Sequence, residues 1–150
     1  MKKLIIILIT LCLLSPCFAA EKTFYTLGDE SISFEKLISH PNTILFVWAT
    51  WCPSCRRELK SLSQKRIFFE NVNIWYVSTG ERESVVRRYA DAKKMASTVR
   101  NRIILDTDGY IAEKLLVSAI PTFIFFKDGQ PIYKSYFLDN ELLEKVFGEE

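Results

Sequence analysis

Along the chain, short apolar runs alternate with longer stretches in which apolar residues recur at helical spacing. Short runs rich in β-branched and aromatic residues predict strands. These runs occupy residues 24–27, 31–34, 43–48, 72–78, 103–105, 122–127 and 131–136. Residues 43–48 are apolar at almost every position, which indicates a strand that is buried on both faces.

The intervening stretches carry apolar residues about three or four positions apart and predict helices. They occupy residues 34–39, 54–69, 81–99, 110–116 and 140–147. Strands that alternate with helices imply parallel pairing in the centre of the sheet. Turn residues at Gly28-Asp29-Glu30 and at Asp128-Gly129 predict hairpins near the two ends of the domain. We therefore predict an α/β fold, with a central mixed sheet covered by helices on both faces and an N-terminal hairpin.

The first residues have the pattern of a targeting signal. Lys2 and Lys3 precede an apolar run of eleven residues, 4–14, and small residues follow at Cys17 and Ala19. This run is shorter than the roughly 20 residues that span a membrane. We expect residues 1–19 to be a signal peptide cleaved after Ala19, with an uncleaved N-terminal anchor as the alternative. Residues 20–150 would then form one domain outside the cytoplasm, in the periplasm or its equivalent.

Composition narrows the class of protein further. Hydrophobic residues make up 49% of the 150 positions and charged residues 25%, which suits one folded domain. Without Lys2 and Lys3, 18 basic residues face 18 acidic ones. This balance gives no electrostatic argument for binding nucleic acid or an anionic membrane surface.

Cysteine usage points to chemistry and not to structural crosslinks. Cys12 and Cys17 lie in the predicted signal, so the mature chain keeps only Cys52 and Cys55. Secreted proteins that depend on disulfides for stability usually carry several spaced pairs. A pair this close in sequence closes a very short loop and contributes little entropic stability.

The position of this pair in the predicted fold favours a reactive thiolate. A buried strand ends near Trp48 and a helix begins around Pro53, so Cys52 lies at the N-terminus of that helix. Free backbone N–H groups and the helix dipole stabilise negative charge there and lower the pKa of a thiol. Cys55 follows about one turn later, within reach of a disulfide. We predict Cys52 as the attacking thiolate and Cys55 as the resolving thiol.

Two other uses of Cys-x-x-Cys are less compatible with the sequence. A zinc site needs four ligands, but His40 is the only histidine and the mature chain has no third cysteine. We therefore predict no metal in a single chain, while a sensor that shares Cys52 and Cys55 across two chains stays open. His40 is also the only candidate base for a Cys–His hydrolase, and we expect it to be a surface turn residue.

The stretch Trp-Ala-Thr-Trp-Cys-Pro-Ser-Cys-Arg-Arg-Glu, residues 48–58, resembles the active site of the thioredoxin superfamily, in particular its exported TlpA/ResA branch. The resemblance extends over nearly the whole mature chain and includes residues 24–34, a helical insertion around residues 81–99, and Ile120-Pro121-Thr122. It implies a thioredoxin-like fold. It also implies that Pro121 is a cis-proline packed against the cysteines, and that Ile120 and Pro121 help to hold substrate backbone. Trp51 and Pro53, beside the nucleophile, are expected at the substrate-binding rim.

Glu58 matches the glutamate that, in this family, is thought to assist proton transfer at the buried thiol. Its alternative role is only a favourable interaction with the dipole of its helix. The chain departs from thioredoxins proper at Phe46, where those proteins carry a buried acid. Proton transfer is therefore expected to depend on Glu58 or on water. The charged run 81–88 is expected to be a solvated helix face.

The expected activity is dithiol–disulfide exchange with a protein disulfide, with no organic cofactor or metal. The dipeptide Pro53-Ser54 lacks the histidine of strongly oxidising relatives, which favours a reductase. The resemblance implies a membrane thiol transporter of the DsbD or CcdA kind as electron donor, and cytochrome c maturation as one role. A disulfide oxidant or isomerase and a non-catalytic binding module that uses the Pro121 face are the alternatives.

Overall fold

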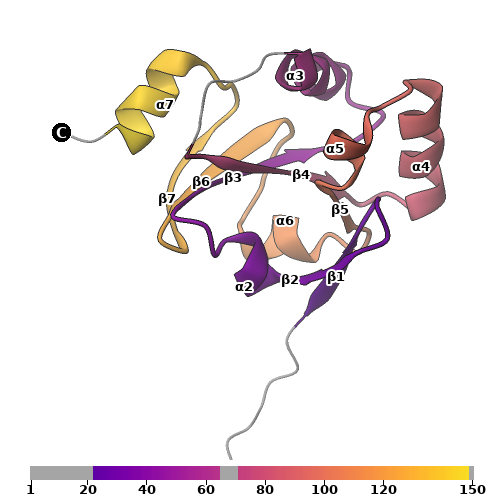
Figure 1. The fold of residues 1–150 in the computed structure, drawn as a ribbon, viewed down its shortest axis with the longest axis horizontal. Coiled ribbons are helices and arrows are strands. Elements are labelled where there is room, and N and C mark those ends of the chain that lie inside the picture. Colours follow the sequence, from indigo (N-terminus) through magenta and orange to yellow (C-terminus); the bar gives the residue numbers. More distant parts are fainter. Residues whose placement is uncertain (1–21, 65–70, 149–150) are drawn as a thin grey trace, which may run out of the picture.

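Within residues 22–64 and 71–148, which the computed structural model describes, seven strands form one mixed sheet in the order β2-β1-β5-β4-β3-β6-β7. The strands are β1 Thr23–Thr26, β2 Ser31–Ser33, β3 Asn42–Trp48, β4 Asn73–Thr79, β5 Ile103–Asp106, β6 Thr122–Lys127 and β7 Gln130–Ser135. The helices are α2 Phe34–Leu37, α3 Pro53–Gln64, α4 Glu83–Ala92, α5 Ser97–Arg100, α6 Tyr110–Lys114 and α7 Asn140–Phe147. Helices lie on both faces of the sheet (Figure 1), as predicted.

Strand pairing follows the predicted division into a parallel centre and antiparallel ends. β3 pairs with β4 and β4 with β5 in parallel, while β1–β2, β1–β5, β3–β6 and β6–β7 are antiparallel. At the β6–β7 turn, Asp128 and Gly129 both have positive φ, 50° and 77°. A tight two-residue hairpin turn whose twist matches that of the strands requires positive φ at both residues.

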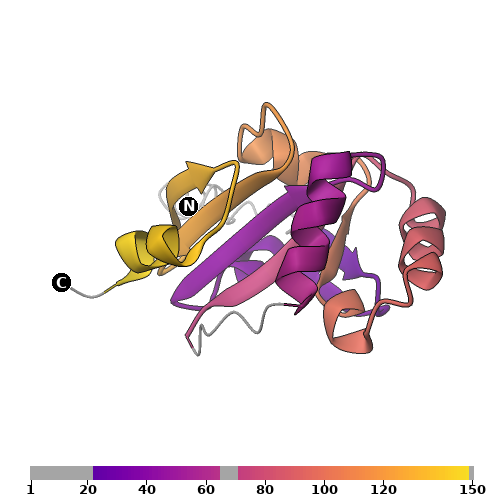
Figure 2. The same cartoon turned by 90° about the horizontal axis from the view of Figure 1, so that it is seen from above.

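Strand β3 divides the core into two layers because its successive side chains point to opposite faces. Ile44, Phe46 and Trp48 face the layer that packs under α3, α4 and α7. Leu45 and Val47 face the layer that packs against α2 and α6. Since all five are fully buried, β3 is covered on both sides as its apolar run predicted. Seen from above, α3 crosses the sheet over this strand (Figure 2).

The single helix predicted over residues 81–99 is wrong, because the structure has two helices there. α4 ends in a left-handed turn at Lys94, whose φ is 50°. The Lys94 N–H donates to the carbonyl of Asp91 and the Met95 N–H to that of Ala90, both at 3.0 Å. This is the hydrogen-bond pattern of a Schellman cap, which normally uses glycine. Lysine at this position hid the helix end from the sequence pattern.

Two predictions concern residues beyond those described. The signal predicted at residues 1–19 lies outside them, as do residues 65–69 of the helix predicted over 54–69. Among the residues described, no helix has the length and apolarity needed to cross a membrane.

Candidate active site

The two cysteines lie where β3 passes into α3, at the carboxyl end of the central strands. The Cys52 N–H donates to the Ala49 carbonyl at 3.2 Å, which turns the chain between strand and helix. The Cys52 carbonyl accepts the N–H of Arg56 at 3.1 Å, the first hydrogen bond of the helix. Cys52 is therefore the N-cap residue and Pro53 the first helical residue, where its missing N–H has no consequence. A disulfide joins Cys52 to Cys55, with the Cα atoms 5.2 Å apart.

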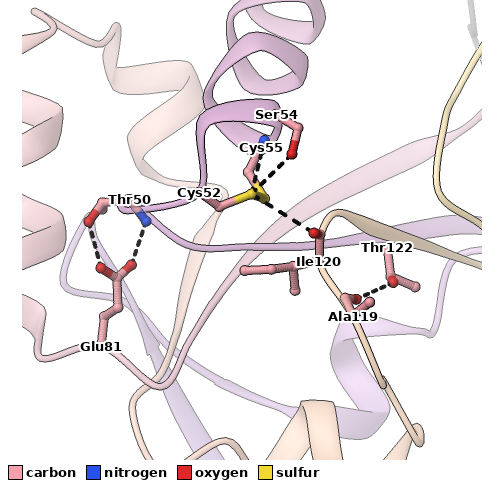
Figure 3. Close-up of a disulfide and its surroundings, with 8 residues drawn as sticks. All are labelled: Thr50, Cys52, Ser54, Cys55, Glu81, Ala119, Ile120 and Thr122. Atoms are coloured by element: carbon pink, nitrogen blue, oxygen red, sulfur yellow. Dashed lines mark hydrogen bonds between the residues drawn. A yellow bond between two sulfur atoms is a disulfide. The ribbon is translucent and has the colours of Figure 1, made fainter.

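The Cys52 sulfur takes the place of an N-cap side chain, which accepts hydrogen bonds from the first turn of its helix. The Cys55 N–H points at it from 3.2 Å and the Ser54 hydroxyl lies 3.3 Å away (Figure 3). When the disulfide opens, both groups can donate to a thiolate, and the helix dipole acts in the same direction. Such an environment lowers the pKa of a cysteine thiol. Cys52 is 4% exposed and Cys55 is fully buried, so Cys52 is the sulfur that a second protein can reach.

The loop before β6 forms the opposite wall of the site. The Ile120–Pro121 peptide bond is cis, the conformation that the family resemblance implies. The Ile120 carbonyl lies 3.9 Å from the Cys52 sulfur (Figure 3). The Thr122 hydroxyl donates to the Ala119 carbonyl at 2.6 Å and closes the loop on itself. Ile120 and Pro121 are half-buried, and their contact with substrate stays a prediction.

Trp51 and Pro53, the two neighbours of Cys52, are both exposed. The Trp51 side chain is 69% exposed, which is unusual for so large an apolar residue. The structure thus leaves an uncovered aromatic ring on the residue that precedes Cys52. Its role at the substrate-binding rim remains a prediction.

Glu58 is less closely tied to the cysteines than its predicted role suggests. It lies on α3 and is half-buried. Its carboxylate makes no hydrogen bond or ion pair with the residues described here, and proton transfer through it stays a prediction. Phe46, in contrast, fills the position of the buried acid of thioredoxins with an aromatic ring. It stacks on Phe123 at 4.6 Å and meets Tyr76 edge-on at 6.3 Å.

The sequence analysis missed an acidic residue of the site, Glu81. The charged run 81–88 was expected to be solvated, but Glu81 is only 9% exposed and precedes α4. Its carboxylate accepts the backbone N–H of Thr50 at 2.7 Å and the Thr50 hydroxyl at 2.5 Å (Figure 3). It also accepts the Ser78 hydroxyl at 3.3 Å. A buried carboxylate needs such donors. The predicted topology could have indicated this contact. Thr50 and Glu81 follow neighbouring parallel strands, whose carboxyl ends lie at the same edge of the sheet.

The site offers thiol chemistry. Across residues 22–64 and 71–148, no three His, Cys, Asp or Glu side chains gather where they could hold a metal ion. A redox-active pair with one reachable sulfur, held at a helix N-terminus, is the arrangement that exchanges disulfides with other thiols.

Comparison with known proteins agrees with this geometry. Residues 16–138 match the model of the AhpC/TSA family. The sporulation thiol-disulfide oxidoreductase A of Bacillus subtilis is 28% identical over 110 residues, covering 65% of this chain. The chain spans only 62% of the length of that relative.

Two solved structures are similar in fold. StoA from Bacillus subtilis superposes with a TM-score of 0.66 at 23% identity, covering 87% of this chain and 98% of StoA. A secreted Mycobacterium tuberculosis disulfide oxidoreductase homologous to E. coli DsbE gives a TM-score of 0.64 at 22% identity, covering 83% and 92% of the two chains. The predicted thioredoxin-like fold is thereby confirmed. On the match over most of its length, the chain belongs to the AhpC/TSA family.

Proposed function

We propose that the chain is a thiol–disulfide oxidoreductase that reduces protein disulfides outside the cytoplasm. The observation that carries the proposal is the asymmetry of the pair. Cys52 is reachable and its sulfur faces the Cys55 N–H and the Ser54 hydroxyl, while Cys55 is buried behind it. A nucleophile with some accessible surface and a fully protected second thiol are the two parts that stepwise exchange requires.

The reaction transfers two electrons from the cysteine pair to the substrate. The Cys52 thiolate attacks one sulfur of the substrate disulfide; a Cys52–substrate bond forms, and the other substrate sulfur leaves as a thiolate and takes a proton from water. Cys55 then loses its proton and attacks the Cys52 sulfur. The mixed disulfide breaks, the second substrate thiol is released, and the Cys52–Cys55 disulfide forms. Glu58 is the residue proposed to exchange the Cys55 proton with solvent.

The reducing direction rests on the dipeptide between the cysteines. Pro53-Ser54 offers a hydroxyl to the Cys52 thiolate but no imidazolium charge. A weaker stabilisation of the thiolate corresponds to a lower reduction potential and a better reductant. A disulfide oxidant or isomerase is the alternative direction. A binding module without catalysis is the alternative class, in which the Pro121 face holds a partner and the cysteines are silent.

Location and electron supply extend the proposal. The signal-like pattern of residues 1–19 supports export, and one similar structure is of a secreted oxidoreductase. Outside the cytoplasm, the oxidised pair needs electrons from across the membrane. We propose a membrane thiol transporter of the DsbD or CcdA kind as their source, and the reduction of apocytochrome c thiols before haem attachment as one use.

The reduction potential of the Cys52–Cys55 pair, measured in dithiothreitol and glutathione buffers, tests the direction. A potential of about −250 mV or lower supports a reductase, and one near −120 mV indicates an oxidant. Failure of the pair to form an intramolecular disulfide would favour the binding module. Fusion of the chain to alkaline phosphatase, which is active only after export, tests the location.

A further inference from the structure

A groove runs along α3 and begins at Pro53, the residue after Cys52. It has a volume of about 670 Å³ and lies between α3 and the α4–α5 segment. Pro53, the residue after the nucleophile, lines it, so the groove reaches the site itself. Apolar side chains lie along it, from Leu59, Tyr89, Met95 and Val99. The α4–α5 segment therefore builds one wall of a groove that begins next to Cys52.

The groove gathers positive charge from a chain that has little net charge. Five of its lining residues are basic: Arg56, Arg57, Lys60, Lys93 and Lys94. All five are exposed, and none of its lining residues within the described ranges is acidic. The whole chain carries 20 Lys and Arg against 18 Asp and Glu, so this is a local concentration and not a general excess.

These cations lack partners among the residues described. The ion pairs found there use other cations, namely Lys22, Arg87 and Arg100. Like charges along one cleft repel one another, and an anionic ligand relieves that repulsion. Opposite charge in a partner also speeds and orients its approach.

We propose that this groove binds an acidic segment of the protein substrate, next to the cysteine that Cys52 attacks. The inference rests on the proposed function and specifies the class of substrate. Lys60 lies about two turns along α3 from Cys52, roughly 12 Å. An extended chain rises about 3.3 Å per residue. Carboxylates within about four residues of the substrate cysteine therefore reach the groove, and an apolar residue between them contacts Met95 and Val99.

A concave shape favours a peptide over a lipid surface. Peripheral membrane binding relies on basic residues together with apolar side chains that protrude into the bilayer. Here the apolar residues lie within the cleft: Leu59 is buried, and Tyr89, Met95 and Val99 are half-buried. A peptide can enter between α3 and α5, whereas a membrane cannot follow that shape.

The test compares two peptide disulfides that differ only in charge. One carries Asp at four positions within four residues of its cysteine and the other carries Ser there. The readout is the ratio of kcat/KM for the acidic peptide to that for the Ser peptide, with the reduced full-length protein. We expect the wild-type ratio to be about fivefold or more, mainly through KM, since each surface ion pair contributes a small factor. It should fall towards one as salt is raised.

Charge reversal locates the effect. The double variant Lys60→Glu and Lys93→Glu should bring the ratio to one or below, and Lys60→Gln with Lys93→Gln should give an intermediate value. The matched control reverses Lys127 and Lys145, which are exposed on β6 and α7 and do not line the groove. It should keep the wild-type ratio. Equal ratios in the wild type and the double variant would overturn the proposal.

Two further measurements separate the possible failures. Anisotropy with fluorescent peptides in which the cysteine is replaced by serine reports binding without exchange. Binding of the acidic peptide alone, lost in the double variant, supports the groove even if no disulfide is reduced and the proposed function fails. If both peptides bind equally and are reduced at equal rates, the proposed function stands, but the proposal that the groove binds acidic segments is wrong. Cosedimentation of the wild type with phosphatidylglycerol vesicles, lost in the double variant without any peptide preference, would assign the groove to lipid instead.

Discussion

The carboxylate of Glu81 accepts both the backbone N–H and the hydroxyl of Thr50, two residues before Cys52. A third hydrogen bond, from the Ser78 hydroxyl, holds the same carboxylate against the end of β4. Glu81 thus joins the ends of two parallel strands and holds the segment that leads to Cys52. Cys52 itself is the N-cap residue of α3, and Thr50, two residues earlier, is the residue that this carboxylate holds.

Removing this carboxylate should destabilise the fold. Glu81→Ala leaves the half-buried Thr50 N–H without its partner. A fully buried unsatisfied donor costs about 1–3 kcal/mol, so we expect a loss of about 1 kcal/mol here. The free energy of unfolding from urea titration measures the loss. Thr50→Val is the matched variant, because it removes only the hydroxyl and keeps the backbone hydrogen bond, so its loss should be smaller. An unfolding free energy of Glu81→Ala equal to that of the wild type would show that solvent replaces the carboxylate without cost.

Ser54→Ala should raise the pKa of the Cys52 thiol in the reduced protein. The Ser54 hydroxyl, 3.3 Å from the sulfur, is one of two local donors that a thiolate can use, and hydrogen bonds to the charged form lower a pKa. The rate of alkylation by iodoacetamide as a function of pH measures this pKa. Ser63→Ala is the control, because that hydroxyl also lies on α3 but donates to the Lys60 carbonyl. Coincident pH profiles for Ser54→Ala and the wild type would contradict the contact.

Cys55→Ser should trap substrate as a mixed disulfide on Cys52, whereas Cys52→Ser should trap none. The difference follows from exposure, because Cys52 can be reached from solvent and Cys55 is fully buried. Non-reducing electrophoresis and mass spectrometry of the two variants after incubation with an oxidised protein substrate measure the adducts. Equal trapping by both variants would reverse or abolish the assigned order of attack.

Much of the site could be predicted because its determinants are local. A strand, two cysteines and a proline follow one another within residues 42–55, and their order alone places Cys52 at a helix N-terminus. Glu81 could not be found that way, since its partner Thr50 lies 31 positions away and is brought near only by the register of β3 and β4. The break between α4 and α5 was hidden for another reason. Lys94 adopts a positive φ that the sequence pattern assigns to glycine.

Phe46→Ala should cost about 3–5 kcal/mol of stability, the usual range for an aromatic residue removed from a core. Phe46 is fully buried and contacts the rings of Phe123 and Tyr76. Urea unfolding measures the loss, and Phe46→Leu, which leaves a smaller cavity, is the graded control. A loss below about 1 kcal/mol for Phe46→Ala would show that the rings around this position do not depend on it.

Asp106 should give the stability of the fold a measurable pH dependence. It is fully buried at the end of β5, and its carboxylate accepts the N–H groups of Ile111 and Ala112 and the hydroxyl of Thr79. Burial raises the pKa of Asp106 above its ordinary value, although these hydrogen bonds act in the opposite direction. The folded state therefore binds a proton more tightly than the unfolded chain. The stability that this gives is fully present below the unfolded pKa of about 3.9 and is lost as pH rises through the higher folded pKa.

Asp106→Asn removes this titrating carboxyl group. Because the wild type and the variant share all other carboxylates, the difference between their unfolding free energies isolates the contribution of Asp106. The unfolding free energy of the wild type minus that of Asp106→Asn should be largest near pH 3.5 and should decrease towards pH 7. Asp108→Asn is the opposite control, because the hydrogen bond from Lys22 lowers the pKa of Asp108. Its difference should instead decrease as pH falls. A difference for Asp106→Asn that increases with pH would show that the three hydrogen bonds outweigh burial.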